Sequence, residues 1–191
     1  MKRKRKIIVY IATSADGYIA RADGSFDWLD RPRPPDNYGM GAFVRSIDTI
    51  LWGRKTYDLA LRFGGSGGFG RKIKNYVFSR RRRESSEPGV EFIRQPIAAF
   101  AKRLRGQAGK HIWIMGGAGL IASFLDRGQI DEFWIHVVPK LIGDGIPLVR
   151  PIRRDVELAL KSTRRFQDGL VELKYAVKPG SNQRRRARQR S

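Results

Sequence analysis

The stretch DTILWGRKTYDLAL, residues 48–61, contains the pattern from which the architecture of the chain can be inferred. An apolar run ends at Gly53, and the residues from Arg54 onward have the composition of an amphipathic helix. A buried strand that passes directly into a helix is the first half of a β–α–β unit, in which the next strand returns parallel to the first. This stretch therefore predicts an α/β protein with a parallel sheet.

The same alternation continues on both sides of this stretch. Strands are predicted at residues 6–12, 48–53, 74–79, 89–93, 111–115 and 131–138, and helices at residues 37–47, 54–61, 96–105 and 118–126. An antiparallel pair closes the chain, at residues 156–163 and 169–177. We therefore expect a mostly parallel central sheet with an antiparallel C-terminal hairpin and helices on both faces. The glycine-rich residues 64–70 lack the Gly-Lys-Ser/Thr ending of a phosphate loop and are interpreted as a linker.

The length and composition are those of one folded domain. The chain has 191 residues, 41% of them hydrophobic, and no apolar run approaches the roughly 20 residues that a membrane helix needs. The apolar residues 7–12 are too few for a signal peptide, so we expect a buried first strand and a cytoplasmic protein. The absence of cysteine excludes disulfides and the zinc site of nucleobase deaminases. His111 and His136 lack the spacing of metal ligands, so we expect each on a strand and no metal site.

The positive charge is concentrated at the two ends of the chain. Residues 2–6 contribute +5 and residues 178–190 contribute +6, so the ends hold +11 of the net charge of +21. Such ends can bind nucleic acid through counterion release, or they can be solvated segments that add solubility. The end from residue 181 lacks aromatic residues that would stack on bases, which favours solvation. We expect a basic extension at residues 1–5, a domain at 6–178 and a disordered basic tail at 179–191.

The residues that follow each predicted strand are the candidates for ligand binding, because parallel α/β sheets bind ligands beyond the carboxyl ends of their strands. Gly53 is followed by two cations and a hydroxyl, Arg54, Lys55 and Thr56, on the first turn of a helix. Backbone N–H groups at a helix start bind phosphate, and a bound anion would compensate for cations placed there. The alternative is a cationic turn exposed to solvent.

Two further strand ends have similar features. Ser79 and Arg80 follow a predicted strand and could meet Arg54 at one phosphate ester, such as the 2′-phosphate that distinguishes NADPH from NADH. The alternative is a basic loop facing solvent. Gly116 and Gly117 separate a buried strand from a helix, and the lack of side chains there would let the backbone contact a ligand. The alternative is close packing of the helix on the strand.

Together these motifs resemble the dihydrofolate reductase superfamily, and within it most closely the reductase domain of riboflavin biosynthesis and its stand-alone relatives. Five motifs occur in the family's order between residues 6 and 177, at residues 12–20, 53–57, 114–117, 128–132 and 138–145. The resemblance implies a three-layer α/β domain, commonly a homodimer, that uses NADPH to reduce a small heterocyclic substrate. The implied activity is 5-amino-6-(5-phosphoribosylamino)uracil reductase, with reduction of dihydrofolate or another pterin as the alternative. A basic nucleic-acid-binding protein is the alternative from another class.

The same resemblance implies where NADPH binds. The backbone of Ala12 and Ile19 would hold the nicotinamide carboxamide, and Arg54 and Ser79, helped by Arg80, would bind the 2′-phosphate. The pyrophosphate and ribose would be bound by Lys55, Thr56, Gly116, Gly117, Ala118, Gly119, Leu120 and Ile121. The family joins its paired glycines by a cis peptide bond, which we expect between Gly116 and Gly117.

Three residues are candidates for the substrate site. In folate-reducing members a carboxylate at the start of the first helix binds the pterin ring, and Asp36 is the residue nearest that position. Its alternative role is to cap the helix. Trp28 and Tyr38 could stack on a flat ring or pack against the core. The chain has Met115 where riboflavin enzymes usually carry Glu, and Ile121 where folate enzymes usually carry an aromatic residue, so the motifs single out neither substrate.

Overall fold

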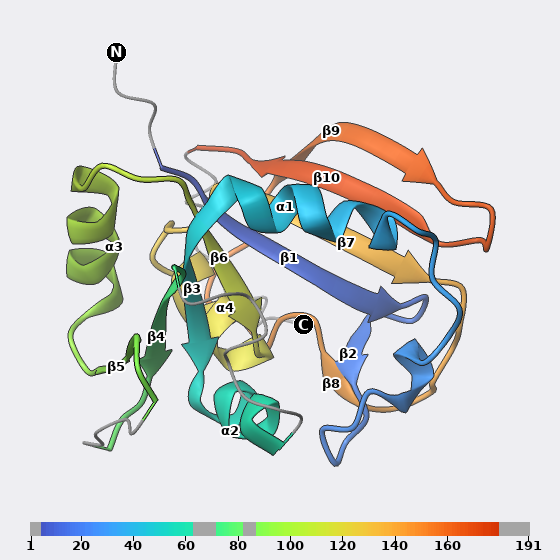
Figure 1. Cartoon of the computed structure of the whole chain (residues 1–191), viewed down its shortest axis with the longest axis horizontal. Helices are drawn as coiled ribbons and strands as arrows, with labels where there is room; N and C mark the ends of the chain where they lie inside the picture. Colours follow the sequence, from blue (N-terminus) through green and yellow to red (C-terminus); the bar gives the residue numbers. More distant parts are fainter. Residues whose placement is uncertain (1–4, 63–71, 82–86, 180–191) are drawn as a thin grey trace, which may run out of the picture.

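The computed structural model describes residues 5–62, 72–81 and 87–179. Within these ranges, eight strands form one sheet in the order β5-β4-β3-β6-β1-β7-β10-β9 (Figure 1). The strands are β1 (Ile7–Ser14), β3 (Ile47–Gly53), β4 (Lys74–Phe78), β5 (Val90–Ile93), β6 (His111–Gly116), β7 (Glu132–Val138), β9 (Leu158–Arg165) and β10 (Val171–Val177). The predicted linker at residues 64–70, and the predicted tail from residue 180 onward, lie outside the described ranges.

The direction of the strands follows the prediction. All neighbouring strands from β5 to β7 pair in parallel, and β10 pairs antiparallel with both β7 and β9. β1 carries an almost unbroken apolar run because both of its faces are covered, as is usual for parallel strands. The mostly parallel sheet with an antiparallel C-terminal hairpin is therefore confirmed.

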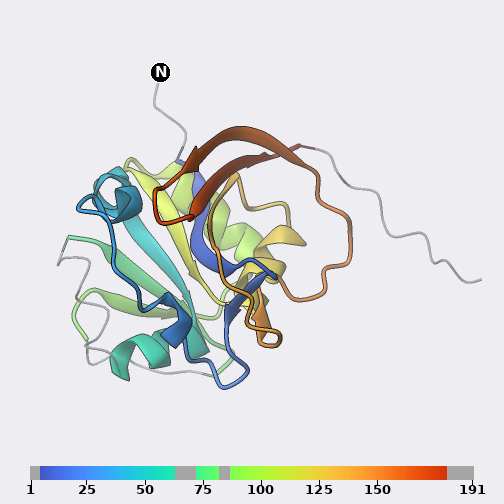
Figure 2. The same cartoon turned by 90° about the vertical axis from the view of Figure 1, so that its right-hand side faces the viewer.

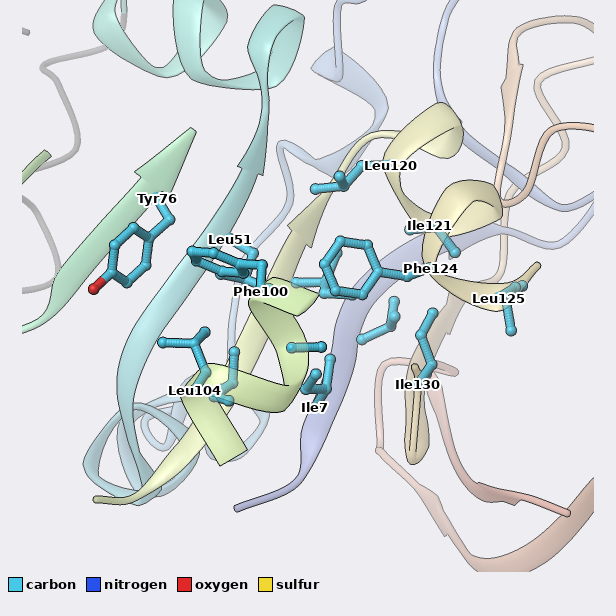
Figure 3. Packing of buried hydrophobic residues seen from close by; sticks show 14 of the residues in the cluster. Ile7, Leu51, Tyr76, Phe100, Leu104, Leu120, Ile121, Phe124, Leu125 and Ile130 are labelled. Carbon is cyan, nitrogen blue, oxygen red and sulfur yellow. The ribbon is translucent and has the colours of Figure 1, made fainter. Parts of the chain in front are cut away.

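Four α-helices of the described chain cover the sheet: α1 (Met40–Ser46), α2 (Arg54–Arg62), α3 (Ile97–Gly106) and α4 (Ala118–Leu125). Successive side chains of a strand point to opposite faces, so β1 contributes to two cores. On one face, Phe100 of α3 and Phe124 of α4 pack with Ile7 and Val9 (Figure 3). The other face is covered by α1 and α2, whose Phe43 and Tyr57 pack with Ile8, Tyr10, Trp52 and Trp113. The sheet is thus the middle of three layers.

The first helix is shorter than predicted. Instead of one helix over residues 37–47, a 3₁₀ turn η2 (Asn37–Gly39) precedes α1, and Ile47 already begins β3. Tyr38 has φ 56° and Gly39 has φ 82°, which are left-handed values that interrupt an α-helix. The apolar spacing of this segment does not reveal that interruption.

Arg5 belongs to the folded domain and not to the basic extension predicted at residues 1–5. Its side chain is 4% exposed. Its guanidinium donates to the carbonyl oxygens of Lys110 at 2.7 Å and Leu104 at 3.1 Å, to Thr49 Oγ1 at 2.8 Å, and to the Asp48 carboxylate. A buried cation is tolerated when its donors are satisfied in this way. The prediction of a boundary between residues 5 and 6 is therefore wrong by one residue.

A small second sheet joins two loops beyond the end of β1. It pairs β2 (Tyr18–Ala20) with β8 (Ile146–Pro147), and neither strand was predicted. The Asp16 carboxylate accepts N–H bonds from Ile142 at 3.0 Å and Gly143 at 2.7 Å, which ties the two loops together. After β8 the chain arches away from the sheet before it enters β9 (Figure 2).

Candidate cofactor and substrate site

Three strand ends meet at one edge of the sheet. β4, β3 and β6 are parallel neighbours, and their register pairs Gly53 with Phe78 and Trp52 with Gly116. Ser79 follows Phe78 directly, so Gly53, Ser79 and Gly116 all lie at the carboxyl edge (Figure 1). This convergence is the geometry that the predicted dinucleotide site requires.

The same edge is split between β1 and β6. Among the described residues, the pairing of these strands ends at Val9 and Ile114, whereas β1 stays paired with β7 as far as Ser14 and Val138. β1 leads through α1 to β3 on one side, and β6 leads through α4 to β7 on the other. Neighbouring strands whose connections run in opposite directions form a topological switch point, where open α/β sheets bind ligands.

The backbone of Ala12 points toward this split. Successive residues of a parallel strand direct their N–H and C=O groups alternately to the two neighbouring strands. The Lys6 carbonyl accepts from Ile112 of β6, and the Ile7 carbonyl accepts from Asp131, next to β7. The even-numbered residues of β1 therefore face β6, and Ala12 directs its polar groups to the side where pairing has ended. Its predicted contact with a carboxamide fits this orientation.

The glycines of the edge are in close contact. A Cβ atom added to Gly53 would lie 3.2 Å from the backbone nitrogen of Gly117, and one added to Gly117 would lie 3.0 Å from Thr56 Oγ1. Gly116 has φ 136° and is joined to Gly117 by the predicted cis peptide bond. A side chain at Gly53 or Gly117 would thus crowd the packing of β3 and α2 on the turn after β6. A contact of these glycines with a ligand remains a prediction.

Two helices begin at this edge, one on each face of the sheet. α2 starts directly after Gly53, and α4 starts directly after Gly117, which makes no side-chain cap. The first N–H groups used within α4 are those of Leu120 and Ile121, and both donate to the Gly117 carbonyl. The N–H groups of residues 118–119 precede them and lie at the positive end of the helix dipole, where an anion is favoured.

Arg54 has a partner within its own helix. Its Nε lies 2.7 and 2.6 Å from the two carboxylate oxygens of Asp58. This pair, four residues apart on α2, gives a first-turn cation a stabilising partner without any anionic ligand. The presence of cations in the first turn is therefore weaker evidence for phosphate binding than the sequence suggested.

The other predicted phosphate ligands lie near the same edge but make local contacts. Ser79 Oγ donates to the Arg81 carbonyl at 3.0 Å and accepts from the Arg81 N–H at 3.3 Å. Lys55 and Arg80 are exposed. Ile19 lies on β2, beside β1. Binding of the 2′-phosphate, the ribose and the carboxamide by these residues remains a prediction.

Asp36 occupies the N-cap position of η2, but its side chain makes no capping hydrogen bond. No side-chain bond caps η2, and the half-exposed Asp36 carboxylate accepts from Arg164 Nη2 at 3.3 Å. The side-chain bond that the helix-capping alternative requires is therefore absent at η2. A role for Asp36 in binding substrate remains a prediction.

Trp28 and Tyr38 both pack against the core near the end of β1. Trp28 lies on the 3₁₀ turn η1 (Asp27–Leu29), is 2% exposed, and packs with Val138 and Phe166. Its buried Nε1 has no hydrogen-bond partner among the described residues. Tyr38 packs edge-on against Phe166, and its hydroxyl donates to Asp168 Oδ2 at 2.6 Å. Packing, the alternative to ring stacking, is thus present, and stacking on a substrate remains a prediction.

A buried polar cluster lies on the sheet face that α1 covers. This His136 cluster comprises Tyr10 of β1, His136 of β7, and Glu172 and Lys174 of β10. His136 Nε2 lies 3.4 Å from Glu172 Oε2, and the two side chains are 5% and 9% exposed. Lys174 Nζ lies 3.1 Å from Glu172 Oε1 and 4.0 Å from the centre of the Trp134 ring. The Tyr10 and His136 rings are 4.7 Å apart.

The charges in this cluster compensate one another. Burial alone would raise the pKa of the Glu172 carboxyl, but His136 and Lys174 beside it hold that pKa below its ordinary value. Burial and the Glu172 carboxylate both raise the pKa of Tyr10, so its hydroxyl stays protonated at neutral pH. The imidazole is thus surrounded by a carboxylate, an ammonium group and a neutral phenol. The sequence predicts His136 on a strand, but no pattern in it indicates this cluster.

Neither a metal site nor a membrane span is found in the described part of the chain. No three histidine, aspartate or glutamate side chains gather there in a way that would hold a metal ion. None of its helices combines the length and the apolar character needed to cross a bilayer.

The chain is similar to known proteins over most of its length. The family model of the RibD C-terminal domain matches residues 5–172. The uncharacterized protein YwjB of Bacillus subtilis (strain 168) is 38% identical over 172 residues, which cover 90% of this chain and 98% of YwjB. A crystal structure of a protein assigned to riboflavin biosynthesis in Shewanella sp. PV-4 matches with a TM-score of 0.81 and 29% identity, covering 91% of this chain and 99% of the other. Dihydrofolate reductase of Enterococcus faecalis, complexed with NADP(H), has the same fold, with a TM-score of 0.67, 14% identity and coverage of 91% and 96%. The predicted three-layer dihydrofolate-reductase-like fold is therefore confirmed.

Proposed function

We propose that this chain is an NADPH-dependent reductase of a small heterocyclic substrate, because it belongs to the RibD C-terminal domain family. The proposed reaction resembles that of 5-amino-6-(5-phosphoribosylamino)uracil reductase, and reduction of dihydrofolate or another pterin is the alternative within the same fold. The observation that carries the proposal is the meeting of Gly53, Ser79 and Gly116 at one sheet edge, beside the split between β1 and β6.

The order of features along this edge supports a dinucleotide. The sheet places β1, β6, β3 and β4 side by side, so Ala12, the turn at residues 116–121, the turn at residues 53–56, and Ser79 with Arg80 follow one another in space. These are the segments expected to bind the nicotinamide, the pyrophosphate and ribose, and the 2′-phosphate, in the order in which these groups occur along NADPH. The cofactor, when bound, supplies the hydride.

The substrate would lie on the face of the sheet that α1 covers. Asp36 and Tyr38 are at the start of that helical segment, and Trp28 lies near the end of β1. We propose that Asp36 contacts the heterocycle and that the two aromatic side chains border it. The chain's own contribution to the reaction is to hold the ring next to the split and to exclude water from it.

Thermal unfolding with each cofactor tests the proposal. A ligand at 100 times its dissociation constant stabilises a protein by about 2.7 kcal/mol, so we expect a clear rise in Tm with NADPH and a smaller rise with NADH. Arg54→Ala removes a cation from the expected 2′-phosphate site and abolishes that difference. Lys161→Ala, which removes one exposed charge from β9, keeps it. Equal shifts with both cofactors in the unmodified protein would contradict the 2′-phosphate assignment.

Asp58→Asn provides a test in the opposite direction. The Asp58 carboxylate binds the Arg54 guanidinium in this structure, so its neutralisation releases Arg54 for a phosphate. We expect tighter binding of NADPH and unchanged binding of NADH, measured by titration calorimetry. A NADPH-oxidation assay with pyrimidine, pterin and small carbonyl substrates then identifies the class of substrate.

A further inference from the structure

We propose that two copies of this chain form a dimer through one surface, which consists of the groove beneath the connection from β8 to β9 and the outward leucines of β9. None of the residues that line this groove belongs to the segments expected to bind NADPH. The dimer is therefore independent of the proposed reductase activity.

The groove lies between the connection and the end of the sheet. Figure 2 shows the chain after β8 standing away from the sheet before it returns as β9. The hollow beneath it has a volume of about 720 Å³ and is lined by residues between 147 and 158, by Leu125 at the end of α4, and by Phe133 and Ile135 of β7. All but two of the lining residues are apolar. An apolar hollow that is open at the surface is typical of a binding site.

Two leucines continue this apolar surface onto the outermost strand. Leu158 lines the groove and is 38% exposed, and Leu160 is 56% exposed. Leu160 is the register partner of Tyr175, which is itself paired with Phe133, so all three side chains lie on the face of the sheet that holds the groove. In the described chain, the core that α3 and α4 cover on this face includes no residue of β9. The groove and the two leucines thus form one apolar surface that the chain itself leaves uncovered.

The distribution of charge favours a second copy of the chain as the partner. The net charge of +21 makes two copies repel one another over most of their surface and would draw an acidic partner to the basic regions. Among the described residues, the charged ones that line the groove are Arg150 and Asp155, and their charges cancel. Two copies can therefore meet at this face without the repulsion that opposes contact elsewhere.

The edge of the sheet is unsuited to the same contact. β9 is the last strand, and it exposes Lys161, Arg164 and Arg165. Pairing of β9 with β9 of a second copy would bring these cations together on neighbouring strands. Lys161 also lies where the register between β9 and β10 shifts, and both edge lysines and such irregularities oppose pairing with another strand. The two copies are thus expected to meet by the faces of their sheets.

A two-fold axis makes the groove and the leucines complementary. In a two-fold interface each copy contributes the same patch, so the leucines of each copy enter the groove of the other. The groove and β9 together have nearly as many residues as one side of an interface of standard size, which uses about 20–30. Residues 180–191, which follow β10 closely, have one apolar side chain, Ala187, and cannot supply the apolar contacts that the groove offers.

Sedimentation velocity of the full chain over a range of concentrations tests the surface. We expect a dimer, and we expect Leu160→Arg to raise its dissociation constant about 100-fold, because residues at the centre of an interface carry most of the binding energy. Leu141→Arg is the matched control, since this leucine is 73% exposed and lies between β7 and β8 without lining the groove. It keeps the dimer. Added salt should strengthen the dimer, because salt screens the repulsion between the copies and leaves the apolar contact in place.

Labelling of a single thiol examines the same surface without a charged substitution. The chain has no cysteine, so Leu160→Cys introduces one reactive side chain. We expect a bulky maleimide to label it more slowly at concentrations at which the dimer forms than after dilution. Leu141→Cys is the control and should be labelled at the same rate in both conditions.

Each outcome decides the proposal. Loss of the dimer in Leu160→Arg alone, together with slower labelling of Leu160→Cys in the dimer, supports it. A chain that stays monomeric at every concentration overturns it, as does an equal dissociation constant for Leu160→Arg and Leu141→Arg. If circular dichroism shows that Leu160→Arg is unfolded, the labelling decides alone, and a rate that does not change with concentration overturns the proposal. Faster labelling of Leu160→Cys after deletion of residues 180–191 overturns it too, because the chain's own C-terminal residues would then cover the surface.

Discussion

Arg5 shows at the scale of one residue how a cation can be part of a protein core. Its guanidinium is bound by acceptors from three separate segments, at residues 48–49, 104 and 110. Those segments form the start of β3, the end of α3 and the loop before β6. Arg5 therefore joins the N-terminal edge of the sheet to the helix that follows β5.

Removing this side chain is expected to destabilise the domain. Arg5→Ala leaves the Asp48 carboxylate without its cation and removes the guanidinium donors to Thr49 Oγ1 and to the Leu104 and Lys110 carbonyl oxygens. Breaking a buried, hydrogen-bonded ion pair typically costs about 3–5 kcal/mol, and the partial exposure of Asp48 places the expected loss near the lower limit, at about 3 kcal/mol. Chemical denaturation measures the free energy of unfolding. Arg62→Ala, at an exposed position of α2, serves as the control and should stay within about 0.5 kcal/mol.

Residues that the sequence identifies owe their place to their neighbours in the chain. Residues that it does not identify owe their place to segments far away in the sequence. Gly53, Ser79 and Gly116 each follow an apolar run directly, so their place at a strand end is a local property. Arg5 and the His136–Glu172 pair depend on contacts between distant segments and on the register of β7 with β10. The register of two strands that are distant in the sequence depends on the hydrophobic patterns of both and on the connection between them, so neither strand reveals it alone.

The strands, as elements, were predictable because apolar and β-branched residues favour a pleated surface covered on both sides. The start of α1 was not predictable, because Tyr38 adopts a left-handed φ that few non-glycine residues adopt. The β2–β8 pair was missed for another reason. Its two short strands carry no periodic pattern, and they are joined through the distant contact of Asp16 with residues 142–143.

β3 packs closely against the turn after β6, so a side chain at Gly53 is expected to disturb both segments. Gly53→Ala places a Cβ atom 3.2 Å from the Gly117 nitrogen and 3.3 Å from the Gly116 oxygen, both backbone atoms. Crowding of this kind typically costs about 1–3 kcal/mol, and here it also displaces the turn expected to bind the pyrophosphate. We therefore expect a lower free energy of unfolding and weaker NADPH binding, measured by denaturation and calorimetry.

Gly106→Ala is the matched control for Gly53→Ala. Gly106 ends α3, and an added Cβ atom there would meet no other atom within 4 Å. Alanine also favours a helix more than glycine, so this variant should be neutral or slightly stabilised and should bind NADPH normally. Equal free energies of unfolding for the two variants would show that the contact of β3 with the turn at Gly116 and Gly117 is not tight.

The whole molecule combines two features that place a site between its layers. Helices on opposite faces start from neighbouring strands, which produces the split between β1 and β6. The second feature is charge, because residues 7–177 carry a net charge of +10, which favours an anionic cofactor. Homodimer formation, which the resemblance implies, remains a prediction that sedimentation can test.

Nucleic-acid binding and cofactor binding are expected to depend on different parts of the chain. Deletion of residues 1–4 and 180–191 removes three basic residues from one end and five from the other, without acidic residues among them. If these ends bind phosphates, the full chain binds DNA with an affinity that falls steeply with salt, and the truncated chain loses that binding. The NADPH-induced rise in Tm should be the same in both, because the cofactor segments lie between residues 12 and 121. DNA binding that keeps the same salt dependence after truncation would instead locate the phosphate contacts on the folded domain, where they would compete with NADPH for its cations.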